Sequence, residues 1–142
     1  MGRLLGAGLL GALLLGAMPA AAQSFDGVWQ GRIRCEAAGS LGALNAPIKV
    51  TIAGNRASYE REIRSTSDRS QVLATETGSG TVAADGTVRM NGTVGAATWR
   101  QDSNFTGRMQ RPTTTLGGGI TTFSRQNNAG VERRCTATIT PG

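Results

Sequence analysis

Hydrophobic and polar residues alternate along most of the chain beyond residue 23. In residues 25–35, Phe25, Trp29 and Ile33 share one face with glycines, while the positions between them are mostly polar or charged. This period of two is typical of a strand that packs on one side only. The same pattern predicts strands at residues 47–52, 57–65, 77–83, 87–94, 97–101, 104–110 and 132–140.

Short turns separate the predicted strands. Gly54-Asn55 follows the second strand, and Asp85-Gly86 follows the fourth. Both residues of an Asp-Gly pair tolerate the positive φ angles of a type I′ turn, so Asp85-Gly86 predicts a tight hairpin. Residues 66–71 are polar and predict a loop. Residues 113–123 place β-branched residues around three glycines, which predicts a hairpin with a mobile tip or a flexible flap.

Residues 23–142 are therefore expected to form a single all-β domain with a small core. No helical periodicity is found in this part of the chain. About eight short antiparallel strands either close into an up-and-down β-barrel or stack as a two-sheet β-sandwich. We favour the barrel, because closure removes free strand edges and a bond between the two cysteines would tie the first strand to the last.

Residues 1–22 have the pattern of a cleavable signal peptide. Arg3 is followed by an apolar run at residues 4–17, then by Pro19 and a run of three alanines that fits an A-x-A cleavage site. The apolar run is too short to span a bilayer, which needs about 20 apolar residues. We expect a periplasmic or secreted protein with no membrane span after cleavage.

Cys35 and Cys135 are the two cysteines of the chain. In an exported protein they are expected to form a disulfide rather than reactive thiols. If they face each other across an antiparallel pair of strands, Trp29 lies opposite Pro141 and Glu36 lies opposite Arg134. The last two residues would then form an exposed cross-strand ion pair.

Several of these features resemble a group of small exported bacterial proteins with two cysteines and no assigned function. The group opens on F-D-G-x-W and closes on a strand containing a cysteine, as residues 25–31 and Cys135 do here; residues 80–88 also fit. The resemblance implies export and a β fold. Gly27-x-Trp29 is also similar to the opening strand of calycins, in which an Arg near the last strand covers the Trp. Arg133 is the nominal match, but the register above places it far from Trp29.

Charge and residue content limit the chemistry that the protein can perform. The chain has 15 basic and 9 acidic residues and no histidine. The absence of histidine excludes His-based triads and ordinary zinc sites, and bonded cysteines cannot act as nucleophiles. We expect no enzyme activity, no metal and no cofactor. The arginines are scattered and accompany no nucleic-acid motif, so no nucleic-acid partner is expected.

Arg61, Trp99 and Arg100 are the candidate ligand-binding residues. Arg61 alternates onto the face of Tyr59, and a buried guanidinium needs a partner. It either reaches a carboxylate inside the barrel, or binds an anionic ligand there, or is turned outward by a β-bulge. We favour the bulge or a peripheral position of Arg61. Trp99, beside Arg100, either lines a cavity mouth or caps the core.

We therefore expect a monomeric, exported, non-enzymatic barrel that binds a small ligand or a protein partner of the envelope. One alternative is an inhibitor of a secreted hydrolase, which a projecting ordered loop at residues 113–123 would favour. Another is a structural envelope protein without a pocket. A cavity lined by Trp and Arg would favour the ligand-binding protein.

Cleavage after Ala22 is expected to leave Gln23 as the first residue of the exported protein. Mass spectrometry of the protein isolated from the cells that make it tests this directly. A retained N-terminus would contradict cleavage and indicate an anchored protein.

Overall fold

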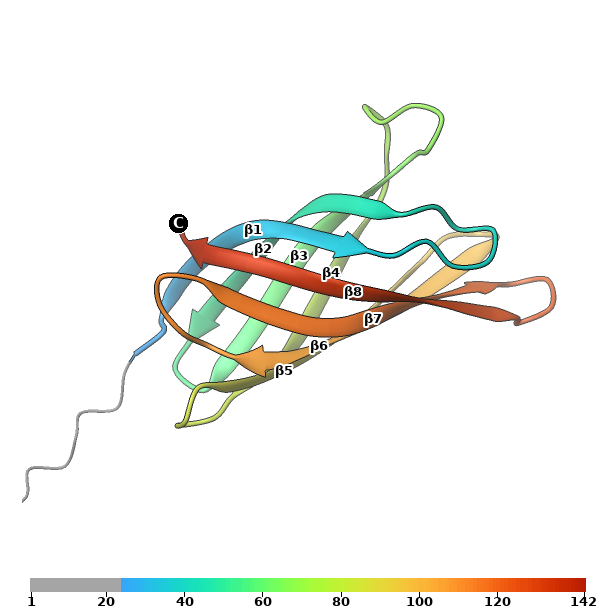
Figure 1. The fold of residues 1–142 in the computed structure, drawn as a ribbon. Helices are drawn as coiled ribbons and strands as arrows, with labels where there is room; N and C mark the ends of the chain where they lie inside the picture. Colours follow the sequence, from blue (N-terminus) through green and yellow to red (C-terminus); the bar gives the residue numbers. More distant parts are fainter. Residues whose placement is uncertain (1–23) are drawn as a thin grey trace, which may run out of the picture.

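The computed structural model describes residues 24–142, and the predicted signal peptide at residues 1–22 lies outside the described residues. Eight antiparallel strands form a closed barrel in which each strand pairs with the next and β8 returns to β1 (Figure 1). No helix long and apolar enough to cross a membrane occurs between residues 24 and 142. The predicted all-β up-and-down barrel is confirmed. The strands are β1 Gly27–Cys35, β2 Leu44–Ala53, β3 Arg56–Arg64, β4 Val72–Val82, β5 Thr87–Gly95, β6 Trp99–Arg108, β7 Thr114–Ser124 and β8 Gly130–Pro141.

Three predicted elements differ from the observed strands. Residues 97–101 and 104–110 were expected to be separate strands, but β6 runs unbroken because Gln101, Ser103 and Phe105 continue the inward alternation. Residues 114–123 lie in the continuous strand β7, so the segment 113–123 forms neither a hairpin nor a flap. A Cβ on Gly118 would lie 1.8 Å from the Asn104 backbone oxygen. This glycine therefore permits close strand packing rather than a turn.

The Asp85-Gly86 hairpin forms, but the predicted type I′ turn is wrong. Gly86 has a positive φ of 89°, whereas Asp85 does not have a positive φ. The Gly86 N–H donates to the Ala83 oxygen at 2.9 Å, and the Asp85 carboxylate accepts from the Thr87 N–H at 2.9 Å. The Asp85 side chain thus caps the start of β5, and only the glycine supplies the left-handed conformation.

The register of the first and last strands is the one that the cysteine pair predicts. Cys35 lies opposite Cys135, to which it is bonded, and Trp29 lies opposite Pro141. The Glu36 N–H donates to the Arg134 oxygen at 2.9 Å. The ion pairs within 4.0 Å in residues 24–142 do not include Glu36 with Arg134. The predicted cross-strand ion pair is therefore wrong.

Aromatic residues close the end of the barrel at which β1 begins and β8 ends. Trp29 is 1% exposed, and its Nε1 donates to the Phe25 oxygen at 2.9 Å. The Arg111 guanidinium lies 5.1 Å from the Trp29 ring centre. Arg111 therefore covers this tryptophan, and Arg133, the residue suggested by the calycin resemblance, does not. We call this end the closed end.

At the opposite end, the hairpin of β3 and β4 leaves the barrel wall. The β2–β3 pairing stops at Lys49 and Glu60, and the β4–β5 pairing stops at Gly78 and Gly92. Beyond these positions β3 and β4 pair only with each other, and the turn at residues 65–71 projects from the barrel (Figure 1, green). This open end therefore has a gap on each side of the hairpin.

The disulfide is expected to contribute strongly to stability, because it closes a loop with a sequence separation of 100 around a small core. Cys35→Ser should lower the free energy of unfolding by about 4 to 5 kcal/mol in the chain-entropy account. Urea unfolding of the variant, and of the native protein with and without reductant, measures the change. Equal midpoints in all three samples would contradict the expectation.

Candidate functional site

Arg61 lies inside the barrel and forms an ion pair. Its side chain is 2% exposed and its Nε contacts the Glu76 carboxylate, which is fully buried. Its Nη2 donates to Gln101 Oε1 at 2.9 Å. Of the three alternatives for Arg61, the internal carboxylate is therefore correct. A register shift does occur, but it lies between Ile63 and Arg64, so it does not turn Arg61 outward.

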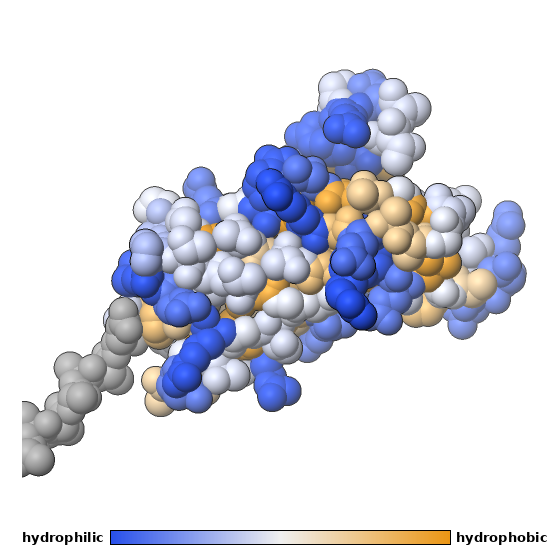
Figure 2. Space-filling model, viewed as in Figure 1, coloured by the Kyte–Doolittle hydropathy of each residue, from blue (hydrophilic) through white to orange (hydrophobic). Residues whose placement is uncertain are grey.

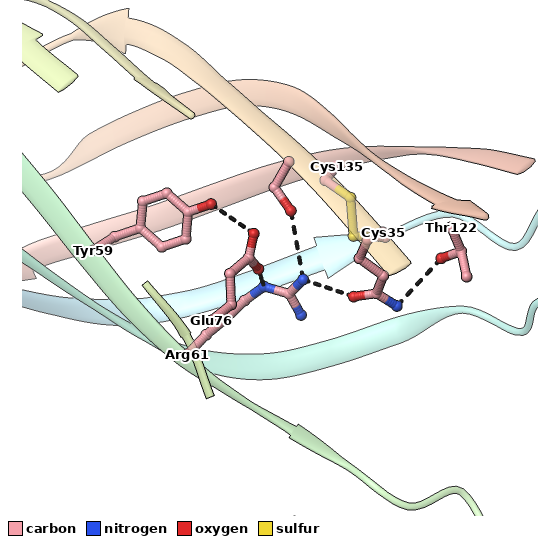
Figure 3. Close-up of polar contacts among 8 residues, drawn as sticks. Cys35, Tyr59, Arg61, Glu76, Thr122 and Cys135 are labelled. Atoms are coloured by element: carbon pink, nitrogen blue, oxygen red, sulfur yellow. Dashed lines mark hydrogen bonds and ion pairs between the residues drawn. A yellow bond between two sulfur atoms is a disulfide. The ribbon is translucent and has the colours of Figure 1, made fainter. Parts of the chain in front are cut away.

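Tyr59 is the second partner of the buried carboxylate. Its hydroxyl donates to Glu76 Oε1 at 2.8 Å (Figure 3). Gly78 and Gly92 pair with each other beneath it. A Cβ on Gly78 would lie 1.9 Å from the Tyr59 ring, and a Cβ on Gly92 would lie 2.1 Å from its hydroxyl. Two glycines therefore provide the space in which Tyr59 reaches Glu76.

The pKa of Tyr59 is raised above its ordinary value. The largest cause is burial, which penalises the phenolate, and the next is the negative charge of Glu76. Tyr59 thus remains a hydrogen-bond donor well above neutral pH. The carboxylate is held on one oxygen by this donor and on the other by Arg61.

Further polar side chains extend this group across the barrel. The Gln101 amide donates to Thr122 Oγ1 at 3.2 Å, and Ser103 Oγ lies 3.5 Å from Arg61 Nη2. β3, β4, β6 and β7 each contribute at least one of these residues. We define the polar cluster as the following six residues: Tyr59, Arg61, Glu76, Gln101, Ser103 and Thr122. Figure 3 labels four of them, Tyr59, Arg61, Glu76 and Thr122.

Arg133 is a second buried guanidinium and has no carboxylate partner. It lies on β8 opposite Ile120 and is 8% exposed. Its Nη1 donates to the Gly42 oxygen at 3.1 Å, but its buried Nε has no hydrogen-bond partner in the described part of the chain. Burial lowers the pKa of Arg133, and the nearby positive charge of Arg61 lowers it further. The buried residues described thus include two guanidinium groups, those of Arg61 and Arg133, and one carboxylate, that of Glu76, which pairs with Arg61.

Arg61 also borders an opening in the barrel wall. A recess of about 260 Å³ lies at the gap between β2 and β3, where Arg61, Gly31 and Ile48 contribute to its lining. The charged rim is largely self-paired, because Lys49 lies 3.9 Å from Glu60, and Glu62 pairs with Arg64 outside the recess. No hydrogen bond of Arg61 Nη1 is found within residues 24–142. The recess is therefore bordered by a residue whose Nη1 makes no hydrogen bond in the described part of the chain.

Trp99 and Arg100 do not join Arg61 in one site. Arg100 lies on the outer face, 4.4 Å from the Phe123 ring centre and 3.3 Å from the Asp102 carboxylate. It lines an external recess of about 310 Å³ with Phe123 and residues of the β7–β8 connection. Trp99 begins β6 on the inner face, half-buried, and lines neither this recess nor the one beside Arg61.

Glu76 and Arg133 were not among the predicted site residues. Glu76 was missed because the predicted strand began at residue 77, which excluded it from the alternation. Arg133 lies two residues before Cys135 in the predicted strand 132–140, so the alternation of that strand puts both on one face and could have indicated a second buried charge. Its proximity to Arg61 depends on barrel closure, which strand patterns alone do not give.

Comparisons of the chain with protein-family models, curated proteins and solved structures found no match. The resemblances noted from the sequence therefore remain predictions. Residues 24–142 hold no group of three or more His, Cys, Asp or Glu side chains that could bind a metal ion.

Tyr59 is the only tyrosine in the chain, so tyrosinate absorbance reports on this residue alone. Because the pKa of Tyr59 is higher in the folded than in the unfolded protein, this residue contributes fully to the free energy of unfolding below its ordinary pKa of 10.0. The contribution is lost as the pH rises above that value. We expect the folded protein to show no tyrosinate near pH 10, whereas the urea-unfolded chain is half ionised there. Equal titration curves for the two states would contradict this.

Proposed function

We propose that the protein is an exported, non-enzymatic β-barrel that binds a small anionic ligand at its open end. The observation that carries the proposal is the unbalanced charge inside the barrel, where Arg61 and Arg133 are buried with one carboxylate. A buried guanidinium without a counter-ion costs several kcal/mol. A ligand carboxylate or phosphate would supply the missing negative charge.

Free donors on both arginines support this proposal. Arg133 Nε is buried without a partner, and Arg61 Nη1 makes no hydrogen bond in the described residues. Guanidinium groups favour oxyanions because their planar N–H groups can donate to two oxygens at once. Arg61 also contributes to the lining of the recess between β2 and β3.

The same contacts favour binding over catalysis. Glu76 is the buried carboxylate of the site, and both of its oxygens are occupied, one by Tyr59 and one by Arg61. A general base needs a free oxygen within reach of the substrate. The absence of histidine from the chain removes the commonest alternative base.

Export to the periplasm or the exterior is part of the proposal. The disulfide is typical of an oxidising environment outside the cytoplasm. The signal-like pattern of residues 1–22 supports the more specific location. The inhibitor alternative depended on a projecting loop at residues 113–123, and those residues lie almost entirely in wall strand β7.

Anion binding should raise the melting temperature, because a ligand that binds only the folded state stabilises it. We expect citrate, acetate or phosphate to raise it relative to chloride at equal ionic strength. Arg133→Gln should abolish the rise without lowering the melting temperature in chloride, since it removes an unpaired buried charge.

Arg134→Gln is the matched control, because Arg134 is the next residue on β8 and is exposed on the outer face. It should respond to the anions as the native protein does. The proposal fails if no anion stabilises the native protein beyond chloride, or if Arg133→Gln responds as strongly as Arg134→Gln.

A further inference from the structure

The projecting hairpin leaves one edge of β4 without a partner strand. β4 pairs with β5 only between Gly78 and Val82, although it begins at Val72. Residues 72–77 therefore pair with β3 on one side and with no strand on the other. A strand edge of this kind presents a row of free N–H and C=O groups.

Hydrogen bonds at the β4–β5 turn show which residues direct their main-chain groups to the free edge. The Ala83 N–H donates toward β5, to the Thr87 oxygen, whereas the Val82 N–H donates toward β3, to the Asn55 oxygen. Main-chain direction alternates along a strand. Thr75 and Thr77 therefore direct their N–H and C=O groups toward the gap between β4 and β5, where no strand accepts them.

The gap on the other side of the hairpin is protected against strand pairing. There, β2 carries Pro47, which has no N–H to donate, and the Asn45 oxygen accepts from Arg32 Nη2 at 3.2 Å. Charged pairs flank the same gap, as described above. Proline and charged side chains are the usual means by which edge strands avoid pairing.

The free edge of β4 has none of these protections. Residues 72–77 contain no proline, and their one charged residue, Glu76, is fully buried inside the barrel. Thr75 and Thr77 present neutral, exposed side chains. Val72 and Leu73 are 41% and 46% exposed, which makes them two of the three large hydrophobic residues that are exposed in residues 24–142. The turn beyond them forms the hydrophilic lobe that projects in Figure 2.

We propose that this edge binds an extended segment of a partner protein by strand addition. The partner supplies main-chain groups that pair with Thr75 and Thr77, together with neutral, β-branched side chains beside the threonines and Leu73. Main-chain hydrogen bonds provide the affinity in this mode of recognition, and alternate side chains provide the selectivity. The edge lies on the opposite side of the hairpin from the recess beside Arg61, so this proposal does not depend on anion binding.

Amide hydrogen exchange provides the baseline for a test. In the free protein, the N–H groups of Thr75 and Thr77 should exchange rapidly, whereas those of Glu76 and Gly78, which are directed toward β3, should be protected. Protection of Thr75 and Thr77 that appears only at high protein concentration would mean that a second copy of the chain occupies the edge. That result would overturn the proposal.

The probe is a short soluble peptide of alternating threonine and valine with a lysine at each end. It should protect Thr75 and Thr77 from exchange and shift their amide resonances. The same peptide with an N-methyl group on every residue keeps the side chains but loses the donors of both edges, so it should bind about tenfold or more weakly. Equal binding of the two peptides, or no protection up to the solubility limit, would overturn the proposal.

Thr75→Pro removes one donor from the edge and should abolish peptide binding, whereas Thr75→Val retains the donor and should bind like the native protein. Continued protection of Gly78 and Gly80 would show that the proline variant is folded; if it is not, Thr77→Pro replaces it. Arg133→Gln should bind the peptide normally, which separates this site from the anion site. Peptide binding by a folded proline variant at native strength would contradict the assignment.

Discussion

Strand β1 pairs with β8 along the seam of the barrel, and the Cys35–Cys135 disulfide fixes these two strands in register. Every inward side chain faces the same interior only because this seam is closed. The closure brings Arg133, on the last strand, close enough to Arg61, on the third, for one positive charge to affect the other. The arrangement of charge inside the barrel thus depends on the closure of all eight strands and not on any one strand.

The interior divides into two chemically different halves. At the closed end, Phe25, Trp29 and Arg111 fill and cover the barrel. At the open end, small residues replace large ones, since Gly78 and Gly92 provide the volume that Tyr59 and Glu76 occupy. A polar cluster of this kind is stable only when its members satisfy one another. Arg133 is not a member of this cluster, and its buried Nε has no hydrogen-bond partner in the described residues, which gives the open end its functional interest.

Much of the fold could be predicted from the sequence, because a barrel that packs on one side imposes a period of two on each strand. The cysteine pair alone was enough to predict the register of the first and last strands, with Trp29 opposite Pro141. The extent of each pairing could not be predicted in this way. Where β3 separates from β2, and β4 from β5, depends on how the twisted sheet closes, and alternation is the same in paired and unpaired segments. Glu76, which lies beyond the predicted start of its strand, and the free edge beside it therefore became apparent only in the folded barrel.

The two ends of the described chain lie together at the closed end of the barrel. Residues 24–27 lead into β1 there, and Gly142 donates its N–H to the Val28 oxygen at 2.8 Å (Figure 1). The polar cluster and the projecting hairpin lie at the opposite end. A tether attached to either end of this barrel would therefore orient the molecule. On a sensor surface or a fused carrier, the proposed anion site and the free edge of β4 would both point away from the point of attachment.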